Sequence, residues 1–169
     1  MNQKILLLIS LFCLNCNKKS YVYTLDKHVS SNHINLRVYN HNKAVVLEDS
    51  IDIYSSNMFD TVQFVNFNHD RIKDVKILFG TDPVLNNGYY LYLYDKDINE
   101  FKKIKGFEDI ANPIYHKKQN LYSSLTLSSI SFYRFYKINN LYEIVQIDTT
   151  ISKDSMNFKL KQFLKKISK

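Results

Sequence analysis

Residues 86–95 read NNGYYLYLYD, and this stretch shows the fold class most clearly. Tyrosine and leucine alternate in the manner of a β-strand with two apolar faces, because successive side chains of a strand point to opposite sides. The preceding Asn-Asn-Gly is typical of a turn, since Asn and Gly tolerate a positive φ. One face of the predicted strand carries Tyr89, Leu91 and Leu93, and the other carries Tyr90, Tyr92 and Tyr94.

Similar strand patterns continue on both sides of this stretch. The predicted strands before it are 21–25, 34–39, 44–47, 51–54, 61–65 and 75–79. Those after it are 101–104, 121–130, 132–138 and 141–147. Asn139 and Asn140 predict a two-residue hairpin turn between the last two. Short strands at regular spacing predict an all-β fold, with antiparallel sheets packed as a sandwich-like single domain.

Helical patterns occur in two places. Residues 109–112 predict a single turn before Pro113. Near the C-terminus, apolar residues with i, i+3, i+4, i+7 spacing predict a short helix that begins near Asp154 or Ser155. We favour a helix that packs on the sheet; a helix that binds a membrane surface or a partner is the alternative. The apolar residues are Leu160, Phe163, Leu164 and Ile167.

The N-terminus has the features of a bacterial export signal. Lys4 precedes a mostly apolar run over 5–14, which is too short to cross a bilayer core of about 30 Å. Cys16 follows and is succeeded by polar residues, a pattern that resembles the lipobox of bacterial lipoproteins. We therefore expect a lipoprotein signal peptide over 1–15, a lipid on Cys16, a tether over 16–20 and a single β-rich domain over 21–169.

Both cysteines of the chain, Cys13 and Cys16, belong to this N-terminal segment. Cys13 and Asn15 depart from the usual lipobox, so cleavage without lipidation and an uncleaved anchor remain alternatives. The predicted domain has no disulfide, thiolate metal site or cysteine nucleophile. We expect it in the cell envelope, lipid-anchored and either periplasm-facing or outer-membrane-associated. Nucleic acid is then a poor partner for a chain with net charge +7, and a soluble lysine-rich surface is the simplest interpretation of that charge.

Residues 66–74, NFNHDRIKD, have the spacing of a calcium-binding loop. Oxygen-bearing side chains fall at loop positions 1, 3, 5 and 9, and a backbone carbonyl at position 7 would add a further ligand. Calcium takes six to eight oxygen ligands, which alternating side chains in a tight loop supply. With two carboxylates the site would be weak and structural, and the alternative is a polar turn held by Asx side-chain bonds. The predicted ligands are Asn66, Asn68, Asp70, Ile72 and Asp74.

Together with the residues that follow it, this loop resembles a known family. After the loop come an Asn/Gly turn, the strand YLYLYD, the segment NEFKKI and an Asn-Pro pair before a further strand. This order, over residues 59–147, is similar to that of bacterial periplasmic inhibitors of invertebrate-type lysozyme. It is also similar to related immunity proteins against peptidoglycan-cleaving toxins. Two positions differ: Asn66 replaces the first Asp of the loop, and Arg71 replaces its Gly.

The resemblance implies an exported all-β domain that binds a muramidase-like enzyme and holds a structural calcium. Family members place a Ser-Gly-x-x-Tyr-like segment in the cleft of the enzyme, near its catalytic carboxylates. The nearest segment here is 128–134, SSISFYR, which lacks the Gly. The partner-binding residues would then be Ser129, Tyr133 and Arg134. The alternative is an ordinary strand with alternate exposed residues.

Patterns of catalytic residues are missing from the sequence. The histidines lack zinc-site spacing, and the three glycines form neither a phosphate loop nor a nucleophile elbow. We predict that the protein is not an enzyme but an envelope lipoprotein that binds and inhibits a peptidoglycan hydrolase. The alternative is a carbohydrate- or surface-binding lipoprotein. It would stack sugars on Tyr90, Tyr92 and Tyr94, unless these tyrosines are buried between sheets.

Overall fold

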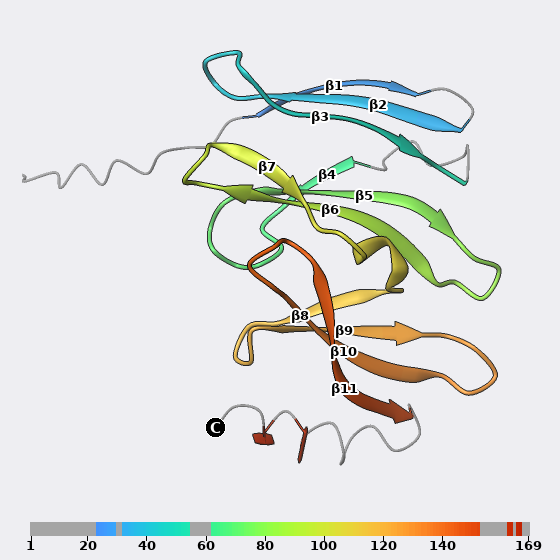
Figure 1. The fold of residues 1–169 in the computed structure, drawn as a ribbon. Helices are drawn as coiled ribbons and strands as arrows, with labels where there is room; N and C mark the ends of the chain where they lie inside the picture. Colours follow the sequence, from blue (N-terminus) through green and yellow to red (C-terminus); the bar gives the residue numbers. More distant parts are fainter. Residues whose placement is uncertain (1–22, 30–31, 55–61, 153–161, 164, 167–169) are drawn as a thin grey trace, which may run out of the picture.

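The computed structural model describes residues 23–29, 32–54, 62–152, 162, 163, 165 and 166. Within these residues eleven strands form three antiparallel sheets, which lie one above another as three layers (Figure 1). Each sheet is built from strands that are consecutive in the sequence, so the chain completes one layer before it enters the next. The predicted all-β, antiparallel, sandwich-like fold is confirmed, with three layers of sheet.

The first sheet forms one outer layer. Its inner face is defined by β2, in which Ile34, Leu36 and Val38 are buried and alternate with exposed residues, as the sequence predicts. These side chains pack against the second sheet. In spatial order the strands are β1 (Thr24–Val29), β2 (His33–Tyr39) and β3 (Val45–Asp52).

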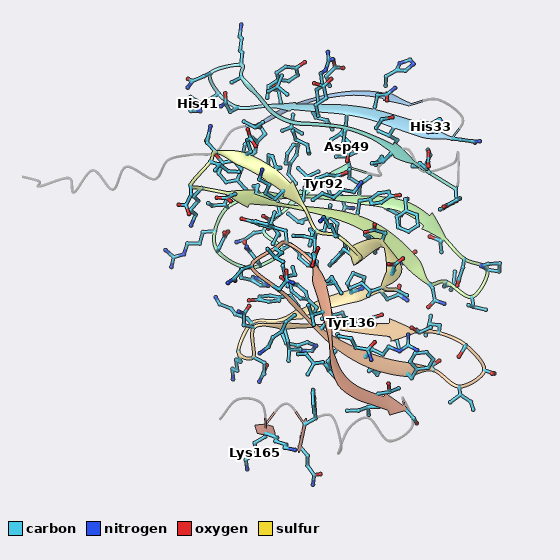
Figure 2. The ribbon with its side chains drawn as sticks, viewed as in Figure 1. His33, His41, Asp49, Tyr92, Tyr136 and Lys165 are labelled. Carbon is cyan, nitrogen blue, oxygen red and sulfur yellow. The ribbon has the colours of Figure 1, made fainter. Side chains whose placement is uncertain are left out.

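Strand β3 replaces two shorter strands that the sequence predicts at 44–47 and 51–54. The polar residues between them remain in the ladder, where Asp49 pairs with Leu36 of β2. The Asp49 carboxylate accepts a hydrogen bond of 2.5 Å from the Tyr92 hydroxyl, which reaches it from the second sheet (Figure 2). A polar residue therefore continues the strand because it has a partner in the next layer.

The second sheet is the middle layer, and both of its faces are packed. Tyr92 and Tyr94 lie in the core against the first sheet, whereas Leu91 lies in the core against the third. The two apolar faces predicted for this strand thus belong to two different interfaces. In spatial order the strands are β4 (Val62–Val65), β5 (Asp74–Thr81), β6 (Asn87–Asp95) and β7 (Glu100–Lys103).

The third sheet follows a single 3-10 turn, η1 (Phe107–Asp109), whose Phe107 is fully buried between the second and third sheets. Strand β8 is absent from our sequence-based prediction. It begins with Pro113 at the edge of the sheet, where a missing N–H leaves no ladder bond unmade. In spatial order the strands are β11 (Ile144–Ser152), β10 (Phe132–Ile138), β9 (Leu121–Thr126) and β8 (Pro113–His116).

The outer face of the third sheet is also apolar. Leu121, Phe135 and Ile151 are buried there, and the Phe163 ring packs 4.6 Å from that of Phe135. Residues 162, 163, 165 and 166 are helical. Phe163 therefore packs on the sheet, as we favoured for the C-terminal helix. Leu160, Leu164 and Ile167 lie outside the described residues.

Two hairpin turns differ from their predicted positions. The predicted two-residue turn at Asn139–Asn140 is a longer loop, in which the Asn139 N–H donates to the Glu143 carbonyl. Before β6 the chain turns between Asp82 and Asn86, so that residues 87 and 88 already belong to the strand. Both hairpins join the strands that the sequence predicts they join.

Candidate functional site

The loop between β4 and β5 holds the predicted calcium ligands in a series of Asx turns. Oδ1 of Asn68 accepts the Asp70 N–H at 3.0 Å, and Oδ1 of Asp70 accepts the Ile72 N–H at 2.7 Å. Oδ1 of Asn66 accepts the Arg71 N–H at 3.3 Å. Arg71 has φ 77, a left-handed conformation that costs a non-Gly residue about 1 kcal/mol. The chain thus makes a sharp turn here without a glycine.

Asp74 fixes the end of this loop where β5 begins. The residue is fully buried, and its carboxylate oxygens accept the N–H groups of Phe67 at 2.9 Å and Tyr94 at 3.2 Å. Burial raises the pKa of Asp74 to about 6, because the loss of hydration outweighs the hydrogen bonds that favour the charged form. Asp74 therefore joins the loop to β6.

The loop fits a cation weakly. The side-chain oxygens of Asn66, Asn68, Asp70 and Asp74 each accept a backbone N–H and keep a lone pair, so a cation would share oxygens that already hold the turn. In the described part of the chain no group of three or more His, Cys, Asp or Glu residues is placed to hold a metal ion. The side chains of Asn66, Asn68, Asp70 and Asp74 and the Ile72 carbonyl are the groups that would hold calcium, which stays a prediction.

The predicted partner-binding residues do not form one surface. Ser129 lies in the exposed loop 127–131 between β9 and β10. Arg134 is half-buried, with its guanidinium carbon 4.6 Å from the centre of the Phe132 ring. The neighbouring Tyr133 is only 8% exposed and lies in the core on the outer face of the third sheet. A partner on this loop would therefore contact Ser129 but not the ring of Tyr133.

A polar clamp ties this loop to the β5–β6 turn. The Nδ2 of Asn86 donates to the Leu127 carbonyl at 2.9 Å, and its Oδ1 accepts the Leu127 N–H at 2.7 Å. Asp82 accepts the Asn86 backbone N–H and its Nδ2, both at 2.8 Å, and these bonds lower the pKa of Asp82. Sequence reasoning missed the clamp because Asn86 and Leu127 are 41 residues apart.

Loops 82–86 and 127–131 lie at the same end of the molecule, on the right of Figure 1, and we call them the loop end. They expose apolar side chains: Leu85 and Ile130 are each 69% exposed, and Val84 is 52% exposed. Leu85 also has φ 66, a strained conformation for a residue with a side chain. Braced loops that carry exposed apolar side chains are typical of protein-binding surfaces.

The tyrosines of the alternative hypothesis are largely buried. Tyr92 is 1% and Tyr94 is 7% exposed, and both lie between the first and second sheets. Tyr90 packs against the same core, and its ring lies 4.5 Å from the Lys103 Nζ. These side chains do not offer a continuous platform for sugar stacking.

The predicted signal peptide, Cys16 and the tether lie outside the described residues. Across the residues that are described, no helix combines the length and apolar character needed to cross a membrane.

Comparisons with known proteins bear on the fold. No family model matches the sequence, and no curated protein matches it. The chain is similar to a solved structure described as "Structure of a Xanthomonas Type IV Secretion System related protein". The TM-score is 0.52 at 15% sequence identity, covering 85% of this chain and 86% of that chain. At this identity the likeness shows the fold alone.

Proposed function

We propose that the protein is an envelope lipoprotein, anchored through Cys16, that binds and inhibits a peptidoglycan hydrolase such as a lysozyme or a lytic toxin. The export signal and the family resemblance of residues 59–147 support this proposal. The observation that carries it is the loop end, where two loops from different sheets are braced together and expose apolar side chains.

The loop 127–131 is suited to enter a narrow cleft. The Ser128 hydroxyl donates to the Ile130 carbonyl at 2.7 Å, and the Ser131 hydroxyl donates to the Ser128 carbonyl at 3.3 Å. The loop is thus shaped before binding, which reduces the entropy lost on association. Ser129 is exposed and is free to donate a hydrogen bond to a catalytic carboxylate of the kind that peptidoglycan hydrolases use.

Net charge favours the same class of partner. The chain carries a formal charge of +7. Opposite charge on the partner accelerates encounter and disfavours other partners. An enzyme cleft that contains ionised carboxylates is therefore a favourable target, and the rate of association should fall as salt is added.

The test is inhibition of a panel of lysozymes and lytic toxins by the full chain, with calcium present. We expect a stable complex with at least one enzyme and loss of its activity. Replacement of Ser129 and Ile130 by Ala should weaken the complex at least about tenfold. Ser50→Ala, on the exposed face of the first sheet, is the matched control and should change nothing. Absence of inhibition and of any complex across the panel would contradict the proposal.

Calorimetry with peptidoglycan fragments separates the proposal from the glycan-binding alternative. We expect no saturable heat, because Tyr92 and Tyr94 are buried. Heat of binding from fragments, together with no effect on any hydrolase, would favour a carbohydrate-binding lipoprotein instead.

A further inference from the structure

A cavity of about 340 Å³ lies beside the loop end, where the β5–β6 hairpin, η1 and the chain after β3 meet. Its lining residues include the aromatic residues Tyr54 and Phe79 and the acidic residues Asp82, Glu108 and Asp109. We call this cavity the acidic pocket. It lies outside the calcium loop and outside the predicted partner-binding segment 128–134.

The pocket is built on a pair of glycines. Gly80 of β5 and Gly88 of β6 are directly paired across the two strands. A Cβ atom on Gly88 would meet the Phe79 Cζ at 2.4 Å, and one on Gly80 would meet the Tyr54 Cβ at 3.4 Å. The two rings therefore lie close to bare backbone. The Tyr54 N–H donates to the Phe79 carbonyl at 2.8 Å, which fixes the position of Tyr54 beside β5.

The charge of the pocket is opposite to that of the chain. Its described lining residues include three carboxyl groups but no Lys, Arg or His, although the whole chain has a net charge of +7. The Oε2 atom of Glu108 is buried and has no hydrogen-bond partner among the described residues. A buried carboxylate oxygen without a partner is unfavourable, and its uncompensated negative charge favours a cation nearby.

The aromatic rings of the pocket also lack a cation. Elsewhere on the second sheet, Lys76 Nζ lies 3.7 Å from the centre of the Tyr89 ring, and Lys103 Nζ lies 4.5 Å from that of Tyr90. Over the described part of the chain, no lysine or arginine takes that position on Tyr54 or Phe79. Tyr54 is 80% exposed, so its ring is accessible from outside.

We propose that the acidic pocket receives an arginine side chain of the protein partner. A guanidinium group stacks on aromatic rings through its plane and donates paired hydrogen bonds to carboxylates through its edge. The pocket offers both, with Tyr54 and Phe79 for the plane and Glu108 for the edge. The ammonium of lysine can also lie over a ring, but it has no plane to stack and cannot donate paired hydrogen bonds from a fixed edge.

The pocket is continuous with the loop end, because Asn86 lines the pocket and also clamps Leu127. A protein seated on the loops would therefore cover the pocket. The identity of that protein rests on the proposed function, whereas the chemistry of the pocket does not.

The test is a titration of the isotope-labelled full chain, followed by amide NMR shifts. The probes are N-acetyl-arginine methylamide, its neutral isostere N-acetyl-citrulline methylamide, N-acetyl-lysine methylamide and N-acetylglucosamine. We expect the arginine probe to bind with a dissociation constant on the order of millimolar and to shift Gly80, Gly88 and Glu108. The citrulline probe should bind at least about tenfold more weakly, since it lacks the charge.

Two variants locate the site. Glu108→Gln keeps the size of the side chain and removes its charge, and Tyr54→Ala removes an exposed ring without opening the core. Both should weaken the arginine probe at least about fivefold. Glu100→Gln makes the same change on β7, where the carboxylate is exposed and pairs with Lys102, and it should leave binding unaltered.

Several results would overturn the inference: no saturable shift at these residues, equal binding of the citrulline or sugar probe, or full binding by Glu108→Gln. Inhibition of a hydrolase without arginine binding would remove only this inference. Arginine binding without inhibition of any hydrolase would remove the proposed function and leave the pocket.

Discussion

The two ends of the second sheet carry similar residues but use them differently. At one end, the Asn and Asp oxygens of the β4–β5 loop accept backbone N–H groups of the loop itself and, through Asp74, the N–H of Tyr94 in β6. At the other end, Asn86 bonds across to Leu127 in the third sheet, and the Glu108 Oε2 has no hydrogen-bond partner among the described residues. At the first end the polar side chains hydrogen-bond within the second sheet and its loop. At the second end the Glu108 carboxylate keeps an oxygen without a hydrogen bond in the described part of the chain, and we propose that a partner pairs with this residue.

This difference separates a role in folding from a role in binding. A loop whose oxygens are used internally stabilises the strands that it joins. The other end exposes Leu85 and Ile130 and has a cavity lined by Gly80 and Gly88. It is folded without a partner, but it leaves apolar surface and a cavity that a partner could cover. Loss of the buried Asp74 at the first end should therefore reduce stability most, and changes to the exposed side chains at the second end should mainly alter binding.

The largest expected effect is at Asp74. Asp74→Ala would leave the N–H groups of Phe67 and Tyr94 buried without an acceptor. Each unsatisfied group costs about 1–3 kcal/mol, so we expect a loss of about 3 kcal/mol in the free energy of unfolding at pH 5. Urea denaturation followed by circular dichroism measures it. Asp97→Ala, at the exposed β6–β7 turn, is the control and should lie within about 0.5 kcal/mol of the unaltered protein.

The same variant should show a distinctive pH dependence. Because the pKa of Asp74 is raised to about 6 in the folded protein, the folded state binds more protons than the unfolded state between about pH 4 and 6. The stability that Asp74 contributes is therefore greatest below pH 4 and falls as the pH rises to 6. The gap in the free energy of unfolding between the unaltered protein and Asp74→Ala should narrow by about 2 kcal/mol over that interval.

Other groups titrate in both proteins, so their contributions cancel in this difference. Asp82 is one of them: its pKa is lowered, and its contribution is instead lost as the pH falls. A gap that widened between pH 4 and 6 would show that the Asp74 carboxyl is charged in the folded protein and held by its N–H donors.

Removal of the clamp at Asn86 tests whether the loop end is one unit. Asn86→Ala deletes the paired bonds to Leu127 and the side-chain bond to Asp82. We expect a loss of about 2 kcal/mol in the free energy of unfolding. Amide hydrogen exchange in loop 127–131 should accelerate more than exchange in β5. Asn140→Ala, at an exposed turn, is the matched control. If exchange in loop 127–131 is no faster in Asn86→Ala than in the unaltered protein, the two loops are held independently.

The glycine pair provides a smaller and more local test. Gly88→Ala places a methyl group 2.4 Å from the Phe79 ring, so the ring must move, at a cost of about 1–3 kcal/mol. Gly80→Ala meets Tyr54 at an ordinary 3.4 Å and should stay within about 0.5 kcal/mol of the unaltered protein. Urea denaturation compares the two variants. Equal stability of the two would mean that Phe79 moves freely and does not shape the pocket.

The alternation of residues 89–94 predicts the central strand and its two apolar faces, and most strands were predicted to within a few residues. Two apolar faces on one strand are consistent with three layers of sheet, but the sequence does not show that each face packs against a separate sheet. The acidic pocket was not predictable, because it depends on the register that places Gly80 opposite Gly88 and on the Tyr54 contact to β5. The family resemblance places Tyr133 on a binding surface, whereas the structure buries it in the cluster that Phe163 covers, and no sequence pattern reveals that contact.

Calcium is expected to have the smallest effect, and it tests the first end directly. Extracellular calcium modules bind with dissociation constants of about 0.1–1 mM. A site at the weak end of that range should stabilise the fold by about 1.4 kcal/mol in about 10 mM calcium, relative to chelator. Asp70→Asn keeps an oxygen for the Ile72 N–H and removes a charge, so it should abolish the calcium effect with little change in the metal-free protein.

Asp97→Asn removes a charge outside the loop and should leave the calcium effect intact. Equal stabilisation by magnesium, or a calcium effect that persists in Asp70→Asn, would mean that the cation acts through general screening. The β4–β5 loop would then be complete without an ion, since its oxygens already accept the backbone N–H groups that form the turn. The contrast with the loop end would be sharper in that case, because the Glu108 Oε2 beside the acidic pocket would still have no hydrogen-bond partner among the described residues.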